Sequence, residues 1–247
     1  MPNWMEIWNN KNVRDFVIKK DSPEKTFMEL KNAMGVNKIG GGEISYKDFF
    51  DQFVINYREM TFSAEEQYIP KSFFDVGCGT GGYLYLLSEM KKGYELGGIN
   101  YSEPFIRIAS KVLGGRVKEL SCGEAIHINT DVTYDHVFSR SIFQYFVDQN
   151  YAEIVVNKMI DKAKHSVGIF DIHDFAKKNA FIAYRKSTIE DYEKKYDDSS
   201  HMFYDKEFFL KIAEKRNCGI KFSKAIIQNY WNAPFTYDVY FYKNENE

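Results

Sequence analysis

The sequence predicts an α/β fold built on a mostly parallel, doubly wound sheet. Residues 73–76 (FFDV) form a short apolar run of the kind that suits a buried parallel strand. Residues 77–82 are rich in glycine, and the apolar segment 83–87 that follows reads as the start of a helix. Further short strand-like runs then alternate with helical segments, which is the pattern of a sheet with helices on both faces. We therefore expect a ligand crevice at the carboxyl edge of the sheet.

The composition limits the classes of protein to consider. The chain has 247 residues, with 44% hydrophobic and 28% charged residues, as is usual for a globular protein with one large α/β domain. Its net charge of −2 and the lack of a long basic run disfavour a nucleic-acid binder. No signal peptide or membrane-length apolar run is evident, so we expect a cytoplasmic protein that does not bind membranes. Three cysteines without a C-x-x-C pair predict neither a disulfide framework nor a metal site.

The glycine-rich turn is the strongest candidate binding site. Gly77, Gly79 and Gly81 allow positive φ angles and the close approach of a ligand, and the next helix directs free N–H groups toward the turn. Gly77, Gly79 and Gly82 also satisfy G-x-G-x-x-G, so a nicotinamide-dependent oxidoreductase is a formal alternative. Asp75 argues against that alternative, because its carboxylate would repel a pyrophosphate and would suit an ammonium group.

The segment DVGCGTG at residues 75–81 closely resembles motif I of the class I S-adenosylmethionine-dependent methyltransferases. The resemblance extends over residues 70–175. It implies a seven-stranded, Rossmann-like sheet whose last strand is antiparallel, with S-adenosylmethionine bound across its carboxyl edge. The cofactor contacts that it implies in this motif are Asp75, Gly77, Cys78, Gly79 and Gly81.

Two further motifs extend this resemblance to the nucleoside part of the cofactor. The predicted strand 94–100 ends at Asn100, where the family usually has an acid that binds both ribose hydroxyls. An amide has only one acceptor oxygen, so it would hold a diol without the strength of a charged hydrogen bond. Tyr101 is expected to stack on the adenine. Glu124 and Ala125 match the family's Gly-Asp-Ala turn, whose acid accepts a hydrogen bond from the adenine amine.

The end of the fourth predicted strand, 134–139, is where this family lines the methyl group. We expect Ser139 and Ser141 to lie beside the cofactor there, and Arg140 and Tyr145 to contact the acceptor. The chain lacks the Asn/Asp-Pro-Pro-Tyr motif of many enzymes that methylate nucleobase or amide nitrogens. The region is more similar to that of small-molecule methyltransferases.

His173 is the predicted general base. It follows the fifth predicted strand, 165–171, at the edge that faces the crevice. Its ordinary pKa near 6.5 would let it accept a proton from a hydroxyl. Asp171 or Asp174 could orient the ring, and we name His173 and Asp171 as the catalytic pair. The alternative is a histidine in a surface loop.

The flanking regions are predicted to supply a lid and the acceptor walls. Residues 1–70 are expected to form a helical cap, and residues 71–247 the methyltransferase domain. Residues 175–217 are expected to be a helical insertion before the last two strands. Those strands, 220–228 and 236–242, alternate in hydrophobicity and are predicted to pair antiparallel.

Single residues in these flanks are also candidates. Trp8 and Lys11 lie on one face of an expected N-terminal helix and could close over the cofactor. The alternative is that Trp4 and Trp8 anchor that helix to the core. His201 and Tyr204 of the insertion are second-choice acceptor contacts.

Together these observations predict S-adenosylmethionine-dependent methyl transfer to a small-molecule acceptor, with an oxygen of a metabolite, sugar or phosphate-bearing compound as the expected target. One alternative is N-methylation of a small amine. Another is a non-catalytic S-adenosylmethionine-binding protein, which the unusual Asn100 would suit.

Overall fold

The structure is a computed structural model that describes Trp8 and residues 22–35, 44–62, 68–192, 201–225, 227 and 229–244. Its centre is a seven-stranded sheet in the order β3-β2-β1-β4-β5-β7-β6. Strands β1 to β5 are parallel, whereas β7 runs antiparallel to its neighbours β5 and β6. This confirms the predicted fold. The strands are β1 (Ser72–Val76), β2 (Glu95–Asn100), β3 (Val117–Cys122), β4 (Tyr134–Arg140), β5 (Ala163–His173), β6 (Cys218–Lys224) and β7 (Thr236–Lys243).

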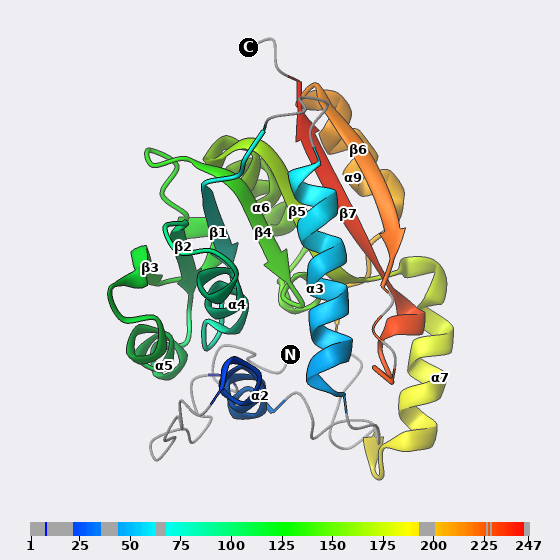
Figure 1. Ribbon diagram of the computed structural model, residues 1–247. Coiled ribbons are helices and arrows are strands. Elements are labelled where there is room, and N and C mark those ends of the chain that lie inside the picture. The colour runs from blue at the N-terminus through cyan, green and yellow to red at the C-terminus, as the bar shows by residue number, and fades with distance from the viewer. Residues whose placement is uncertain are drawn as a thin grey trace.

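Helices cover both faces of this sheet, as Figure 1 shows. Helices α3 and α4 lie on one face, with α5 beside α4, and α6 and α9 lie on the other. Helix α2 packs against α4, beyond the carboxyl ends of β1 and β4. The bounds of these helices are α2 (Pro23–Ala33), α3 (Tyr46–Thr61), α4 (Gly82–Met90), α5 (Glu103–Leu113), α6 (Gln149–Lys162), α7 (Lys178–Thr188) and α9 (Lys206–Lys215).

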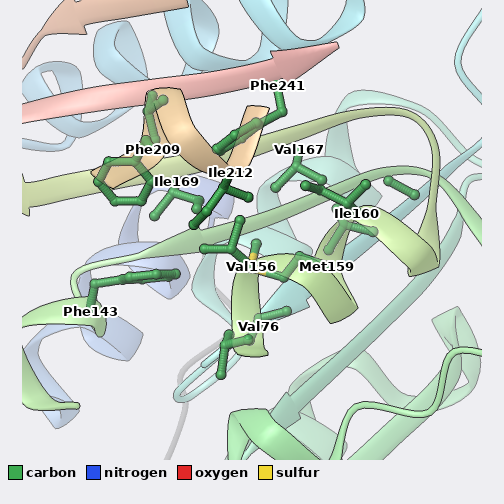
Figure 2. Close-up of a cluster of buried hydrophobic side chains, with 14 of the residues drawn as sticks. Val76, Phe143, Val156, Met159, Ile160, Val167, Ile169, Phe209, Ile212 and Phe241 are labelled. Carbon is green, nitrogen blue, oxygen red and sulfur yellow. The ribbon is translucent and has the colours of Figure 1, made fainter. Parts of the chain in front are cut away.

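The central strands are buried on both faces. All five residues of β1 and the first six of β4 are buried, which is why residues 73–76 read as a continuous apolar run. The edge strand β6 instead alternates between more and less exposed positions. One of the two cores lies under α6 and α9, where their apolar side chains point toward the sheet (Figure 2). Members of this core drawn there include Val156, Met159, Ile160, Val167, Ile169, Phe209, Ile212 and Phe241.

The N-terminal helices begin at clear capping residues. The side chain of Ser22 accepts a hydrogen bond from the Lys25 amide (3.2 Å) before a proline at the first turn of α2. Ser45 and Asp48 form a reciprocal capping box at the start of α3. Helix α3 packs against β5 and shares a hydrophobic core with α2 and α4.

Among the described residues, no helix combines the length and the apolar character needed to cross a membrane.

Candidate cofactor and acceptor site

The glycine-rich turn leaves β1 in a strained conformation that fits glycine. Gly77, Gly79 and Gly81 have φ angles of 81°, 55° and 81°. The amides of Gly77 and Cys78 both donate to the carbonyl of Ile99, at 2.8 and 3.1 Å, which ties the turn to the end of β2. Gly81 then caps α4 in the left-handed conformation. A side chain at these positions would be strained, so the backbone of the turn stays bare.

Helix α2 covers this turn. The hydroxyl of Thr80 donates to the carbonyl of Leu30 in α2, at 2.9 Å. A Cβ atom at Gly79 would lie 2.7 Å from the sulfur of Met34, just after α2. The N-terminal region therefore lies directly against the motif that the sequence singled out.

Two buried groups of opposite charge lie near the turn. Asp75 in β1 is 3% exposed and Lys31 in α2 is 6% exposed. The Lys31 ammonium lies 3.9 Å from the ring centroid of Tyr83. Neither charged group has a hydrogen bond or an ion pair with any other part of the chain that the structure describes. Burial lowers the pKa of Lys31 to about 7 and raises the pKa of Asp75 to about 7.

Arg140 adds a permanent positive charge at the end of β4. Its guanidinium donates to the side-chain oxygen of Asn56 in α3. It also lies over the rings of Tyr83 and Phe170, 5.1 and 5.3 Å from their centroids. Within the described part of the chain, Asn56 is the hydrogen-bond partner of one of its N–H groups, so Arg140 has further N–H groups that can donate to a ligand.

Asp171 joins the ends of β4 and β5 to the segment before β7. Its carboxylate accepts hydrogen bonds from the hydroxyls of Ser141 (2.5 Å) and Tyr230 (3.0 Å) and from the Asn232 amide (3.4 Å). Its own backbone N–H donates to Asp238 at 2.9 Å. Asp171 and Ser141 both have positive φ angles, of 60° and 58°. Burial raises the pKa of Asp171 above its ordinary value.

His173 is the last residue of β5 and is 2% exposed, which excludes the alternative of a surface-loop histidine. Its Nε2 atom lies 3.1 Å from the amide nitrogen of Asn232. The rings of Phe181, Phe203 and His201 surround it, with centroids 4.7, 5.1 and 5.2 Å away. Burial lowers the pKa of His173 well below its usual value, so its ring is neutral at pH 7.

Asn100 and Glu124 lie at the ends of the neighbouring strands. The side-chain oxygen of Asn100 accepts a hydrogen bond from the Gly79 amide at 3.2 Å. Its NH₂ group is buried and has no partner within the described residues. Glu124 accepts a hydrogen bond from the Tyr151 hydroxyl at 3.2 Å and precedes the short helix that begins at Ala125.

Trp8 also lies at this edge. Its ring packs edge-on against Phe105 of α5 and Tyr145 after β4, with centroids 6.1 and 5.8 Å away. The hydroxyl of Ser102 donates to the Trp8 carbonyl at 3.3 Å. Tyr145 in turn lies 5.5 Å from His201. These rings form an aromatic wall that runs from the end of β2 toward His173.

Several buried polar atoms around this edge have no hydrogen-bond partner in the described ranges. Buried polar groups are normally paired, so such a cluster is typical of a site that binds a polar ligand. The donors and acceptors are those a nucleoside and an acceptor molecule could use. The atoms at this edge are Asn100 Nδ2, Ser139 Oγ, Gln144 Oε1, His173 Nδ1 and Asn232 Oδ1.

Most residues predicted from the sequence lie together at this edge, but the side chain of Tyr204 points away from it although its backbone N–H donates to the His173 carbonyl. Tyr204 is fully buried in the core under α6 and α9, and its hydroxyl donates to the Phe143 carbonyl at 2.8 Å. Lys11 and Trp4 lie outside the described residues.

No cluster of three His, Cys, Asp or Glu side chains suited to a metal ion occurs among the residues that the structure describes. The residues brought together at the carboxyl ends of β1, β2, β4 and β5 are Asp75, Gly77, Cys78, Gly79, Gly81, Asn100, Tyr101, Ser139, Arg140, Ser141, Asp171 and His173.

Sequence reasoning missed Lys31, Tyr230, Asn232 and Asp238. They belong to α2, to the segment before β7 and to β7, and no local motif marks them. Lys31 carried one weak signal, since it is a lysine in the last turn of an otherwise amphipathic helix.

Comparison with known proteins identifies the same region. Residues 74–164 match the family model of a methyltransferase domain. The plantazolicin methyltransferase BpumL, solved with a triazolic desmethylPZN analog and SAH, is 16% identical over 90% of this chain and 95% of that chain, with a TM-score of 0.62. Magnesium protoporphyrin IX methyltransferase (ChlM) from Synechocystis PCC 6803 with bound SAH is 13% identical over 90% and 100% of the two chains, with a TM-score of 0.57. No curated protein sequence matches the chain.

The fold, the glycine turn and the matched domain define a methyltransferase. Residues 74–164 match a methyltransferase domain, the whole sheet has the fold of solved methyltransferases crystallised with SAH, and S-adenosylmethionine is the cofactor of such a domain.

Proposed function

We propose that this methyltransferase acts on a small-molecule acceptor and that the methyl group goes to an oxygen atom. The proposal on cofactor placement rests on one observation, the buried pair Asp75 and Lys31 beside the glycine turn. Bound S-adenosylmethionine carries an ammonium and a carboxylate at its amino-acid end. The two side chains offer the complementary charges, and neither has a hydrogen bond or an ion pair among the described residues.

The charges of the surrounding groups support a cationic methyl donor. Among the described residues, the cationic side chains that act on the buried carboxyl groups of Asp75, Asp171 and Asp238 are Lys31 and Arg140. A sulfonium adds one positive charge to this cluster and offsets the excess of carboxyl groups. The negatively charged phosphates of a nicotinamide dinucleotide would be repelled by these carboxyl groups.

We propose that Asn100 binds the ribose as a hydrogen-bond donor. Its oxygen is already used by the Gly79 amide, whereas its buried NH₂ group has no partner in the described part of the chain. Tyr101, Glu124 and Ala125 lie at the ends of β2 and β3 and are the proposed adenine contacts. Trp8 packs across the same edge and would cover the nucleoside.

Bound S-adenosylmethionine supplies an already activated methyl group, so the protein acts mainly by alignment. We assign Arg140, Tyr145, His201 and His173 to the acceptor side of the site, because ring contacts connect Tyr145 to His201 and His201 to His173 and the Arg140 guanidinium lies over Phe170 near the end of β5. The aromatic wall suits a molecule with an apolar body. Solved relatives bind acceptors as different as a desmethylPZN analog and a protoporphyrin, so the acceptor is argued from this site alone.

A small amine is the second candidate acceptor. The observation that favours it is the carboxylate of Asp171 beside Ser141, which is expected to lie next to the methyl group. A carboxylate would attract a protonated amine into the site. Rates with matched hydroxyl and amine acceptors, followed by the formation of S-adenosylhomocysteine, separate the two possibilities.

Calorimetric titration with S-adenosylmethionine and S-adenosylhomocysteine tests the proposed site. We expect both to bind the wild-type protein and neither to bind the Asp75→Ala variant. Asp131→Ala removes an exposed loop carboxylate and serves as the control that should bind normally. Undiminished binding by the Asp75 variant would overturn the proposed placement of the cofactor.

A further inference from the structure

A buried chain of hydrogen bonds connects Asp171 to His173 through Asn232. The Asn232 amide nitrogen lies 3.4 Å from Asp171 Oδ1 and 3.1 Å from His173 Nε2. Asn232 and His173 are each 2% exposed. The two residues expected to form a catalytic pair are thus linked by a third residue that no sequence motif marks.

Asp171 fixes which group donates in each of the two hydrogen bonds that Asn232 makes. The carboxylate already receives the hydroxyls of Ser141 at 2.5 Å and Tyr230 at 3.0 Å, so it acts as an acceptor. The part of Asn232 that faces it must then be the NH₂ group. That group has a second N–H, which points to His173 Nε2, so Nε2 must accept.

A neutral imidazole that accepts at Nε2 carries its proton on Nδ1. The ring is neutral because burial, helped by the nearby His201 and Arg185, lowers the pKa of His173. His173 Nδ1 is buried and has no hydrogen-bond partner within the described ranges. The ring therefore keeps one unsatisfied N–H donor and no free lone pair.

We propose that Asn232 is a positioning residue that holds the proton of His173 on Nδ1, so that His173 donates a hydrogen bond to an oxygen of the acceptor molecule. The part that concerns the acceptor rests on the proposed function. In this role His173 binds and orients the acceptor. A general base would instead need a free lone pair, which the bond from Asn232 occupies. The acceptor must accordingly present a hydrogen-bond-accepting oxygen toward His173.

Long-range ¹H–¹⁵N correlation spectra of protein labelled with ¹⁵N-histidine test this directly. The chain has five histidines, and a His173→Asn variant assigns the signal of His173. We expect a neutral His173 ring with a protonated Nδ1 in the wild-type protein. A ring protonated on Nε2, or on both nitrogens, would overturn the proposal. This outcome does not depend on methyl transfer, so it is separate from the fate of the proposed function.

The Asn232→Asp variant tests whether Asn232 sets the tautomer of His173, because it keeps the size of the side chain and removes its NH₂ group. At a pH at which it is ionised, a carboxylate at this position can only accept, so it should move the His173 proton to Nε2. His136 is the internal control, because its bonds to Tyr68 and Ser166 lie at the opposite edge of the sheet and should not change. A His173 tautomer that stays the same in this variant would contradict the role of Asn232. If the variant does not fold, the wild-type spectrum alone still decides.

Once an acceptor molecule is known, turnover rates of His173 variants distinguish a hydrogen-bond donor from a general base. Asparagine places an amide N–H near the position of Nδ1 but cannot accept a proton. We expect His173→Asn to stay within about tenfold of wild-type kcat/KM, and His173→Ala to lose considerably more. Equal and severe losses in both variants would favour the general base and contradict the donor.

Discussion

At the scale of single residues, Asp75 and Lys31 have pKa values shifted toward each other by burial, each to about 7. The proposed site needs Asp75 ionised and Lys31 protonated. Cofactor affinity should therefore fall as the pH drops below 7, because Asp75 takes up a proton. It should also fall as the pH rises above 7, because Lys31 loses one. Titration calorimetry with S-adenosylhomocysteine between about pH 5.5 and about pH 8.5 should give a bell-shaped profile.

Two variants assign the limbs of that profile. Lys31→Arg keeps its charge across the range, so the alkaline limb should disappear. Asp75→Asn cannot titrate, so the acid limb should disappear while overall affinity falls. A wild-type profile that is flat over the whole range would show that these groups do not contact the cofactor.

Gly79 offers a second test at this scale. Its φ of 55° and the sulfur of Met34 at 2.7 Å from a Cβ position leave no room for a side chain. We expect Gly79→Val to abolish cofactor binding in calorimetry. Gly93→Val is the matched control, because it has a positive φ of 95° but no neighbour within 4 Å. Both variants should lose stability from backbone strain, but only the first should lose the cofactor.

At the scale of elements, α2 is held to the glycine turn by the Thr80–Leu30 hydrogen bond. Thr80→Val removes the hydroxyl with little change of shape. It should lower stability by about 1 kcal/mol and weaken cofactor binding several-fold, since Lys31 sits on the same helix. Thr188→Val is the control, because its hydroxyl makes the same type of bond to a carbonyl in α7. Equal cofactor affinity in both variants would mean that α2 does not hold the cofactor.

The helices and strands were largely predictable from the sequence, because buried positions carry a recognisable pattern of apolar residues. Strand β1 is buried on both faces and reads as an apolar run, and the glycine turn needs residues with positive φ. The ends of β5 and β6 were less well predicted. Strand β5 runs on to His173, where its pairing with β7 continues past the predicted end at residue 171.

The site was only partly predictable for a different reason. Asp75, Asn100 and Asp171 lie in the last three residues of parallel strands, and such positions meet at one edge of the sheet. Lys31 and Asn232 reach that edge from elements far away in the sequence. Their position depends on how α2 and the segment before β7 pack, and packing of this kind leaves no local motif in the sequence.

At the scale of the whole molecule, Asp238 in β7 ties α3 to β5 across the buried sheet. It accepts hydrogen bonds from Asn56 (2.8 Å), Gln52 (3.3 Å) and the Asp171 backbone N–H (2.9 Å). Asp238→Asn replaces one acceptor oxygen by an NH₂ group and leaves a buried donor unpaired. We expect a loss of about 1–3 kcal/mol of unfolding free energy, measured by urea denaturation. Asp131→Asn, in an exposed loop, should be neutral, and an equally small effect at Asp238 would refute its structural role.

The strand order places the carboxyl ends of β1 and β4 side by side at the centre of the sheet, under α2. The central claim is that this point receives the amino-acid end of S-adenosylmethionine. A crystal structure with S-adenosylhomocysteine tests it most directly. We expect the carboxylate of the ligand within hydrogen-bond distance of Lys31 Nζ and its ammonium group beside Asp75. Ligand density elsewhere, with Met34 and Ile142 filling the space at the glycine turn, would contradict it.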